Sequence, residues 1–518
     1  MGSLRDDLGG PGIEVLETHI SWVFLTERDV WKVKKPVSLG FLDFSTAEKR
    51  KAACEAEVRL NRRLAPYVYR GVLPITVDSL GRHRFGGSGV PVDWAVHMDR
   101  LADADRADVR LREGRLSIAH VTGVAKHIAA FHARARSDDQ SARFGAVEAI
   151  TRVIRDNLEV GRAAACDLLG EADAQAIEAE QLGFLSDQAT LFEDRIRAGH
   201  IREGHGDLRL EHVYLGDDDG IRILDCIEFN DRFRFVDVCS DVAFLSMDLV
   251  YHGRGDLAEL FLSRYAQVSN DYDLYPLVGF YESYRAYVRG MVNAIRVEDE
   301  GASASVRERS AGAARRFYRQ ALDSDPEARS VVPPMVLAVG GIVASGKSTL
   351  ADRVGREMRT PVVSSDRTRK WLLGVEPTTS VSPTGSAAPW TAAYSPEMTA
   401  RVYDEVFRRA RSVLESKRPV VIDASFRSKA HREVVRQLAH GAGVPFLFVE
   451  CQVASDVVRE RLHQRDREPT VSDARAALLD DFVAAWESVD ELEPSEHLSL
   501  DTSGSIETNV DLIWSMLG

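Results

Sequence analysis

Strand-like and helical patterns occupy different parts of the first two thirds of this 518-residue chain. Short apolar or alternating runs are concentrated near its start, namely SWVFL, DVWKVK, GVLPIT and WAVHM. From about residue 116 onward, apolar positions recur at helical spacing instead, as in SIAHVTGVAKHIAAFHARA. Strands followed by helices predict an α+β domain over residues 1–328, with a small lobe at about 1–98 and a helical lobe at about 99–328.

A different pattern begins after residues 322–334, where acidic residues precede a Pro pair in LDSDPEARSVVPP. We interpret this stretch as a linker and place a second domain at 333–518. Four short apolar runs follow, MVLAV, PVVSSD, PVVID and PFLFVE, and helical patterns separate them. This alternation predicts an α/β domain with a parallel sheet, whose ligand site lies at the carboxyl ends of its strands. The fold class is therefore multidomain.

The composition narrows the classes of function. The chain is too long for a single core, and its net charge of −14 disfavours wrapping a nucleic-acid backbone. Its five cysteines form no C-x-x-C pair and no His/Cys cluster, which indicates reduced cysteines in a cytosolic protein. The first residues carry no apolar signal-like run, and no apolar run approaches membrane-spanning length. We therefore expect a cytoplasmic protein with no membrane partner.

The segment GIVASGKS at residues 341–348 fits the phosphate-binding pattern G-x-x-x-x-G-K-[ST] at every fixed position. It lies between a predicted strand, MVLAV, and a predicted amphipathic helix, TLADRVGREM. Glycines let backbone N–H groups curl around a phosphate, and the start of the helix adds a favourable dipole. We expect ATP and Mg²⁺ as cofactors, with Lys347 on the β- and γ-phosphates and the Ser348 hydroxyl on the metal. The residues expected to bind ATP here are Gly341, Ala344, Ser345, Gly346, Lys347, Ser348 and Thr349.

Two more runs of this domain lead to aspartates, PVVSSD to Asp366 and PVVID to Asp423. A parallel sheet places substrate-handling carboxylates at the ends of such strands. The run before Asp423 is Walker-B-like, so Asp423 is a candidate Mg²⁺ ligand beside Ser348. Capping of the following helix is the alternative role for either aspartate.

In the helical lobe, His205-Gly-Asp207-Leu is followed closely by Ile-Leu-Asp225. The sequence between them, VYLGDDDGIRIL, predicts strand, acidic turn and strand, so both carboxylates could face one cleft. Two aspartates in this relation form the core of a kinase site. One accepts or orients the substrate hydroxyl, and the other holds Mg²⁺ against the nucleotide phosphates.

These residues resemble the aminoglycoside phosphotransferase family, small-molecule kinases with a protein-kinase-like fold. The match consists of HGDLRLEH at 205–212, ILDCIEFND at 223–231 and the acidic segment DVCSDVAF at 237–244. The resemblance implies a bilobal kinase-like domain in which Asp207 is catalytic and Asp225 binds the metal. His212 stands where the family has an asparagine that binds a second Mg²⁺. An imidazole can be a ligand, but it suits Mg²⁺ less well than an amide oxygen does.

The resemblance also implies a strand lysine that contacts the α- and β-phosphates and a helix glutamate that pairs with it. The chain has ten lysines, and five of them fall between residues 32 and 51. Alternation places Lys32 and Lys34 on one face of the strand, and Glu57 in the following helix is the expected partner. We favour Lys32, which lies earliest after the turn, with Lys34 as the alternative. A solvated basic edge strand is the other interpretation.

The C-terminal domain resembles the polynucleotide-kinase-like P-loop kinases, a group that includes gluconate kinases and zeta toxins. In that group a D-x-x-R motif after the second strand supplies a hydroxyl-activating aspartate and a substrate- or phosphate-binding arginine. Asp366 and Arg369 match this spacing. Arg461-Leu-His-Gln-Arg465 resembles the lid helix, whose arginines stabilise the transferring phosphoryl group. An Arg-rich surface helix is the alternative.

The chain as a whole resembles two-domain bacterial proteins that fuse these two kinds of domain and are often labelled AAA-family ATPases. The leading hypothesis is a bifunctional kinase that transfers the γ-phosphate of ATP to hydroxyls of small-molecule acceptors of the sugar, aminoglycoside or nucleoside type. One alternative is a regulatory ATP-binding protein whose kinase-like first domain is inactive. Another is a kinase of nucleic-acid 5′-hydroxyls, which the net charge disfavours.

Overall fold

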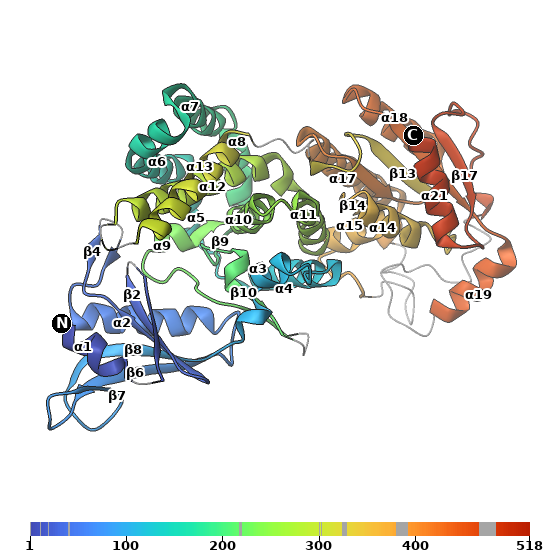
Figure 1. Cartoon of the computed structure of the whole chain (residues 1–518). Helices are drawn as coiled ribbons and strands as arrows, with labels where there is room; N and C mark the ends of the chain where they lie inside the picture. Colours follow the sequence, from blue (N-terminus) through green and yellow to red (C-terminus); the bar gives the residue numbers. More distant parts are fainter. Residues whose placement is uncertain are drawn as a thin grey trace. The chain divides into compact units, whose positions relative to one another are not determined.

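The computed structural model describes residues 2–10, 12–18, 20–39, 42–216, 220–299, 301, 303–323, 329–379, 392–465 and 483–518. The chain forms two compact units (Figure 1). The first consists of Met1–Gly253 and Phe280–Ser324, and the second of Arg254–Gly279 and Asp325–Gly518. The segment Arg254–Gly279 thus groups with the second unit, although the linker lies about fifty residues further along the chain. The domain limits drawn from the sequence, 1–328 and 333–518, stay a prediction.

The first unit begins with helix α1 (Gly2–Leu8) and an antiparallel sheet in the order β1-β2-β3-β8-β6-β7. Its strands are β1 Glu14–Glu17, β2 Ser21–Leu25, β3 Asp29–Lys34, β6 Tyr69–Val77, β7 His83–Phe85 and β8 Pro91–Asp99. Helix α2 (Ala47–Asn61) starts at the Thr46 cap and packs on β8 and β6. Its buried Cys54 and Val58 meet Val96 and Met98 of the sheet. One face of the sheet is thereby covered, and α2 lies next to the strand that carries the candidate lysines.

The first unit is mainly helical after β8, and its described residues also form three short strand pairs, one of which precedes α2. Its remaining helices are α3 Ala107–Arg112, α4 Ile118–Arg134, α5 Asp139–Ala142, α6 Val147–Leu169, α7 Glu171–Asp187, α8 Ala189–Arg197, α9 Asp231–Arg234, α10 Val238–Tyr251, α13 Ala304–Leu322 and the larger part of α12 Tyr275–Val297. Short 3-10 helices are η1 Asp103–Asp105, η2 Arg143–Gly145 and η3 Leu210–His212. The paired strands are β4 Ser38–Leu39 with β5 Leu42–Asp43, β9 Ile201–Glu203 with β12 Phe235–Asp237, and β10 Val213–Leu215 with β11 Ile221–Ile223.

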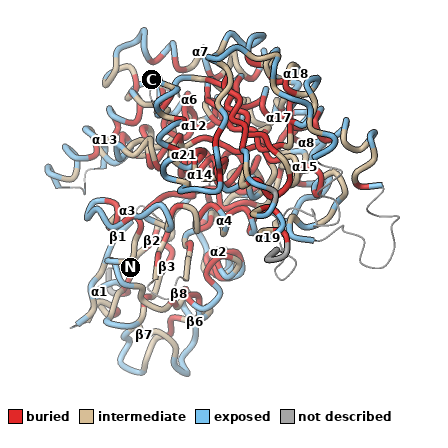
Figure 2. The backbone as a smooth tube through the Cα atoms, turned by 90° about the vertical axis from the view of Figure 1, so that its right-hand side faces the viewer, coloured by how far each residue is buried: buried red, intermediate tan, exposed pale blue. Residues whose placement is uncertain are grey.

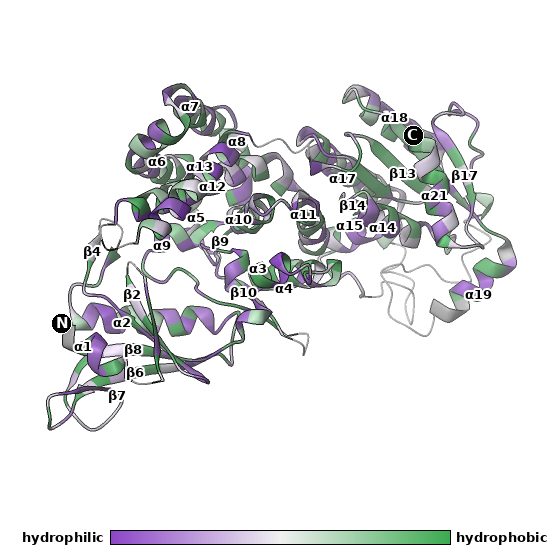
Figure 3. Ribbon diagram, in the orientation of Figure 1, coloured by the Kyte–Doolittle hydropathy of each residue, from purple (hydrophilic) through white to green (hydrophobic). Residues whose placement is uncertain are grey.

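The second unit contains a five-stranded parallel sheet in the order β14-β15-β13-β16-β17. The strands are β13 Val336–Gly341, β14 Val362–Ser364, β15 Val420–Asp423, β16 Phe446–Gln452 and β17 His497–Asp501. In the central strands nearly every residue is buried, as parallel strands covered on both faces require (Figures 2 and 3). The α/β architecture with a parallel sheet that the sequence predicts is confirmed for this unit.

Helices cover both faces of this sheet. The described helices of this unit are α14 Lys347–Glu357, α15 Ser365–Leu372, α17 Pro396–Glu415, α18 Lys429–Gly441, α19 Ser455–Arg465 and α21 Ile506–Leu517, joined by α11 Gly255–Ser269 and η4 Tyr272–Leu274 from the earlier segment. Leu337 and Val339 of β13 point into one apolar cluster with α14 and α21. The alternate residues face the other way, where α17 and α18 pack on the sheet.

Two features of the structure concern the expected location of the protein, namely membrane-spanning helices and disulfide bonds. Among the described residues, no helix is both long and apolar enough to cross a lipid bilayer. The five cysteines all lie in the described part, and none of them forms a disulfide.

Candidate functional site

The phosphate-binding loop connects β13 directly to α14, as the motif requires. Gly341 has φ 144°, and a Cβ there would lie 2.6 Å from the carbonyl oxygen of Cys451. Gly346 adopts the left-handed region with φ 87°, and Ala344 does so with φ 55°. Glycine is therefore needed at 341 for space and at 346 for backbone conformation. A turn with such left-handed residues is the kind of backbone in which successive N–H groups can form a nest for an anion.

Two side chains from later in the sequence hold this loop. The Thr502 hydroxyl donates to the carbonyl oxygen of Ser345. The Arg461 guanidinium donates to the Ala344 carbonyl oxygen at 3.3 Å and to the Thr502 carbonyl oxygen at 2.7 Å. Helix α19 and the end of β17 are thereby tied to the loop. Thr502 had no motif to mark it in the sequence.

A buried carboxylate lies beside the loop. Asp423 ends β15 next to β13, and the hydroxyls of Ser348 and Ser364 hydrogen-bond to it. Its Oδ1 atom is buried and has no hydrogen-bond partner among the described residues. Burial raises the pKa of Asp423; the Lys347 ammonium opposes this rise, and the Asp366 carboxylate adds to it. The Ser348 hydroxyl, the unpartnered oxygen of Asp423 and the Lys347 ammonium therefore act on one another at this place. Hard oxygen ligands beside an ammonium are the groups that suit Mg²⁺ with a bound nucleotide.

The D-x-x-R residues of this unit occupy different environments. Asp366 lies in the first turn of α15, two residues past the end of β14, so the strand is shorter than the sequence pattern indicates. Its charge is felt at Asp423. Arg369 is buried, donates to the Ala393 carbonyl oxygen at 2.6 Å, and lies 4.4 Å from the centre of the Tyr394 ring. The side chain of Arg465, the other lid arginine, lies outside the described residues.

In the first unit, a buried aspartate holds the turn that carries Asp207. Asp241 of α10 accepts the backbone N–H groups of His205 at 2.6 Å and Gly206 at 2.8 Å, and His132 Nε2 lies 3.3 Å away. Burial alone would raise the pKa of Asp241, but the hydrogen bonds from His132 and the turn lower it to about 2. Asp241 lies in the acidic segment of the sequence match, so its presence was visible there but its partners were not.

The ring of His205 links this turn to the next one. Its Nε2 donates to the Leu224 carbonyl oxygen at 2.8 Å, and its Nδ1 accepts the N–H of Asp207 at 3.2 Å. Burial lowers the pKa of His205 to about 4, so the ring is neutral at pH 7. The two candidate aspartates are therefore carried by turns that are hydrogen-bonded to each other.

Asp207 is engaged by an arginine two residues later. Arg209 donates to both of its carboxylate oxygens, Nε to Oδ1 at 2.8 Å and Nη2 to Oδ2 at 2.9 Å. Burial would raise the pKa of Asp207, but the Arg209 guanidinium outweighs burial and holds it well below its usual range. His212 donates from Nδ1 to the Asp207 carbonyl oxygen at 2.8 Å, and Arg209 Nη2 lies 3.2 Å from its Nε2. Arg209 is a feature that the motif comparison did not single out.

Asp225 faces the strand lysines. Its Oδ1 lies 2.7 Å from Lys32 Nζ, which is also 3.0 Å from Glu57 Oε1. Asp225 has φ 64°, a left-handed conformation that is uncommon for a residue other than glycine. Burial would raise its pKa, but Lys32 and His212 hold it well below the usual range. Its Oδ2 lies 4.0 Å from His212 Nε2.

The two lysines of β3 both pair with Glu57 but differ in access to solvent. Lys34 is fully buried between Glu57 and Glu228, whereas 16% of the Lys32 side chain is exposed. The structure thus brings Lys32, Glu57 and Asp225 together. Their functional roles, like those of all the candidate residues, stay predictions. Among the described residues, no group of three or more His, Cys, Asp or Glu side chains is arranged to hold a metal ion by itself.

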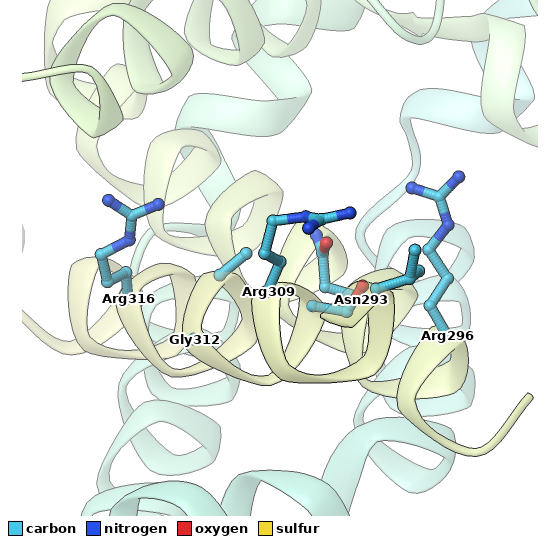
Figure 4. A pocket seen from close by; sticks show the side chains of 8 residues that line it. Asn293, Arg296, Arg309, Gly312 and Arg316 are labelled. Atoms are coloured by element: carbon cyan, nitrogen blue, oxygen red, sulfur yellow. The ribbon is translucent and has the colours of Figure 1, made fainter. Parts of the chain in front are cut away.

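A recess of about 670 Å³ lies elsewhere in the first unit, between α12 and α13. Its lining consists of Asn293, Arg296, Val306, Arg309, Ser310, Gly312, Ala313 and Arg316. Figure 4 shows the three arginines spread along it. None of the candidate catalytic or nucleotide-binding residues lines this recess, so it is separate from both sites.

Comparison with known proteins finds a matching family model and relatives of the chain. A family model described as AAA domain matches residues 336–488. The uncharacterized protein Rv2004c of Mycobacterium tuberculosis and the uncharacterized protein Mb2027c of Mycobacterium bovis are each 34% identical over 460 residues, which is 88% of this chain and 86% of theirs.

Two solved structures are similar to part of the chain. A gluconokinase from Sinorhizobium meliloti is 18% identical, covers 36% of this chain and 91% of its own, and has a TM-score of 0.26. An APS kinase of Mycobacterium tuberculosis in complex with AMPPNP and APS is 19% identical, covers 36% and 98%, and has a TM-score of 0.27. The parallel strand order and the loop between β13 and α14 are properties of this structure and do not depend on this likeness. At 34% identity over 88% of its length, the chain belongs to the same family as the two mycobacterial proteins.

Proposed function

We propose that this protein is an ATP-dependent phosphotransferase whose second unit transfers the γ-phosphate to a hydroxyl of a small molecule. The observation that carries the proposal is the meeting of Lys347, Ser348 and the partly unpartnered Asp423 at one end of a parallel sheet. A P-loop that only binds nucleotide does not need the second acid, Asp366, within electrostatic reach of Asp423. Two neighbouring acids suit one role on the metal and one on the acceptor hydroxyl.

Each residue at this site has its own role in the proposed reaction. The loop N–H groups and the Lys347 ammonium bind the phosphates, and Ser348 and Asp423 would hold Mg²⁺, which neutralises charge that develops on the phosphate oxygens. Asp366 accepts the proton of the acceptor hydroxyl at its carboxylate. Arg461 keeps the loop in shape through the Ala344 carbonyl oxygen. Arg369, tied to Ala393, shapes the acceptor side rather than contacting phosphate in this arrangement.

Replacement of Asp366 by asparagine tests this assignment. Asp366→Asn removes the proposed base with little change in size, so nucleotide affinity should stay within about twofold while phosphoryl transfer falls by roughly 10²-fold or more. Release of ADP during incubation with pooled sugars, aminoglycosides and nucleosides, in an Asp207→Ala background that silences the first unit, measures it. Asp404→Asn, an exposed carboxylate on α17, serves as the matched control. Lost nucleotide binding with normal turnover per bound complex would mean that Asp366 is structural.

We further propose that the first unit is a kinase-like second site, which makes the protein bifunctional. What supports this is that Asp207, Asp225 and Lys32 come from three separate segments and yet lie at one place. Lys32 would bind the α- and β-phosphates, Asp225 would hold Mg²⁺, and Asp207 would orient the acceptor hydroxyl. Asp225 is partly exposed and carries its proton only at very low pH, so it is ready to bind a cation.

One observation favours a second candidate function, in which the first unit binds ATP for regulation and transfers no phosphate. Arg209 donates to both oxygens of Asp207, so neither oxygen is without a charged partner in this arrangement, and an acceptor hydroxyl would have to share it with the guanidinium. In this case only the second unit is an active kinase, and a nucleic-acid 5′-hydroxyl becomes a possible acceptor for it.

The two candidates differ when the second site is disabled. In Lys347→Ala protein, a live first site should retain a residual Mg²⁺-dependent transferase activity, and Asp207→Ala should then remove it. His212→Asn should maintain or raise that activity because an amide oxygen is the better Mg²⁺ ligand. Lack of transfer to every acceptor by Lys347→Ala protein that still binds ATP would favour regulation. Activity lost through His212→Asn alone would assign His212 a role of its own.

A further inference from the structure

The edge of the second unit's sheet is covered by a segment from the middle of the chain. β14 is the edge strand, and a bare edge would leave unpaired backbone groups. The Tyr272 hydroxyl of η4 donates to the carbonyl oxygen of Val362 in β14 at 2.7 Å. The Ser263 hydroxyl of α11 donates to the Thr360 carbonyl oxygen, two residues earlier, at 3.0 Å. Two hydroxyls of the segment Arg254–Gly279 therefore hydrogen-bond to β14 and to the residues just before it, and this strand leads to Asp366.

A buried ion pair fixes the same segment to the start of β15. The Glu259 carboxylate accepts two hydrogen bonds from Arg418, at 2.7 and 2.9 Å, and both side chains are at most 4% exposed. Arg418 lies two residues before β15. A fully buried fork of this kind allows little sliding of α11 relative to the strands.

One arginine joins this segment to the helix that carries Asp366. Arg409 of α17 is 1% exposed, and its Nη1 donates to Asn270 Oδ1 at 3.1 Å and to Thr368 Oγ1 of α15 at 3.2 Å. Its guanidinium lies 4.7 Å from the Trp371 ring of α15 and 5.3 Å from the Tyr272 ring. Asn270 has φ 57°, so the turn after α11 is shaped to present its amide.

We propose that Arg409, with Asn270 and Tyr272 of the inserted segment, is a positioning unit that sets where α15 holds Asp366. The role of Asp366 rests on the function proposed above; the mechanical link from the segment to α15 does not. The geometry of the acceptor side in the second unit is thus set by residues that precede its phosphate loop by about seventy positions. None of these contacts of Arg409 involves β13 or α14, the elements that carry the nucleotide-binding loop.

Two conservative changes test the link without removing core volume. Asn270→Gly deletes the amide and keeps a residue that favours positive φ. Tyr272→Phe deletes only the hydroxyl. Asp273→Asn is the control, because Asp273 lies in the same segment but forms a half-exposed ion pair with Arg408. All variants are made in the full chain.

Hydrogen–deuterium exchange gives a readout that does not depend on activity. In the Asn270→Gly/Tyr272→Phe protein, amides of residues 362–372 should exchange about fivefold faster or more, while those of α14 stay unchanged. The Asp273→Asn control should match the wild type throughout. Equal acceleration in α14 and α15 would mean a general loss of stability, and unchanged exchange at 362–372 would mean no link; either result overturns the proposal.

Turnover provides the second readout, with water as the acceptor in an Asp207→Ala background. The double variant should hydrolyse ATP with kcat about fivefold lower, while KM for ATP and the stoichiometry of ADP binding stay within twofold. A parallel fall of kcat and binding stoichiometry would indicate unfolding and contradict the proposal. If the Asp207→Ala protein binds ATP but transfers phosphate neither to water nor to any of the pooled acceptors, the proposed function of the second unit fails, and the exchange rates decide the positioning role alone.

Discussion

Asp423 is a single residue whose ionised form, the form that would bind a cation, makes the folded protein less stable. It is buried, one carboxylate oxygen has no hydrogen-bond partner among the described residues, and burial raises its pKa above the ordinary 3.8. An acid whose pKa is raised on folding binds extra protons in the folded state. Its neutral form therefore stabilises the protein fully below pH 3.8, and that contribution is lost as pH rises through the folded pKa. The ionised form is the one that a cation needs.

Asp423→Asn should for this reason stabilise the protein in the absence of Mg²⁺ and nucleotide. At pH 8 we expect a gain of about 1 kcal/mol, the order of cost of one unsatisfied buried polar group. The gain should shrink as pH falls through the folded pKa of Asp423, because the wild-type residue is then neutral too. Thermal unfolding of both proteins from pH 8 down to about pH 4, close to the ordinary pKa of 3.8, measures it, with Asp404→Asn as control. A variant that is less stable at pH 8 without ligand would contradict the idea.

Helix α19 is an element whose role depends on one side chain. The sequence resemblance implies that Arg461 acts on the transferring phosphate, whereas in the structure it bonds to the carbonyl oxygens of Ala344 and Thr502. In the second case the helix orders the phosphate loop before ATP arrives. The two roles predict different kinetic effects.

Arg461→Ala should weaken Mg²⁺-ATP binding about fivefold to tenfold, because an unanchored loop must be ordered by the ligand. Isothermal titration with a non-hydrolysable ATP analogue measures this, and Glu460→Gln on the same helix is the control. Unchanged affinity together with a large fall in kcat would show instead that Arg461 acts on the transition state. The side chain of Arg465 lies outside the described residues, so this comparison concerns Arg461 alone.

At the scale of the whole molecule, the order of the sequence and the composition of the compact units differ. The segment Arg254–Gly279 precedes the linker but belongs to the second unit. Cutting the chain at a protease site inserted between residues 324 and 328 should therefore leave two fragments that co-elute on gel filtration at micromolar concentration. Glu259→Ala should weaken that association, since it removes the carboxylate that pairs with the buried Arg418 guanidinium. Clean separation of the fragments of the wild-type sequence would contradict the division into units.

The same observation concerns the use of isolated fragments. A piece covering 333–518 lacks Glu259, Ser263 and Tyr272, and so removes one carboxylate from Arg418 and two hydroxyl donors from the β14 edge. Poor folding of such a piece would say nothing about Lys347 or Asp366. Variants of the full chain are the sounder test of both sites.

Local pattern determined much of this protein. The phosphate loop, the strands that end near Asp423 and Asp366, and the lysine strand with its glutamate helix are all short-range features, set by hydrophobic periodicity and by backbone conformations that only certain residues adopt. The order of the strands could not be obtained in this way, because parallel pairing joins residues far apart in the chain.

Tertiary structure alone decided the partners of the charged residues. No spacing rule indicates that Asp241 accepts hydrogen bonds from the His205–Gly206 turn. Nor does one indicate that Arg209 donates to Asp207, or that the buried Arg369 donates to the Ala393 carbonyl oxygen. Nor could it assign Arg254–Gly279 to the second unit, since a helical pattern shows which face is apolar but not what covers it. The sequence by itself determined which candidate catalytic and binding residues are present, because motifs are local. The fold decided which side chains are restrained, because burial and pairing depend on contacts between distant segments.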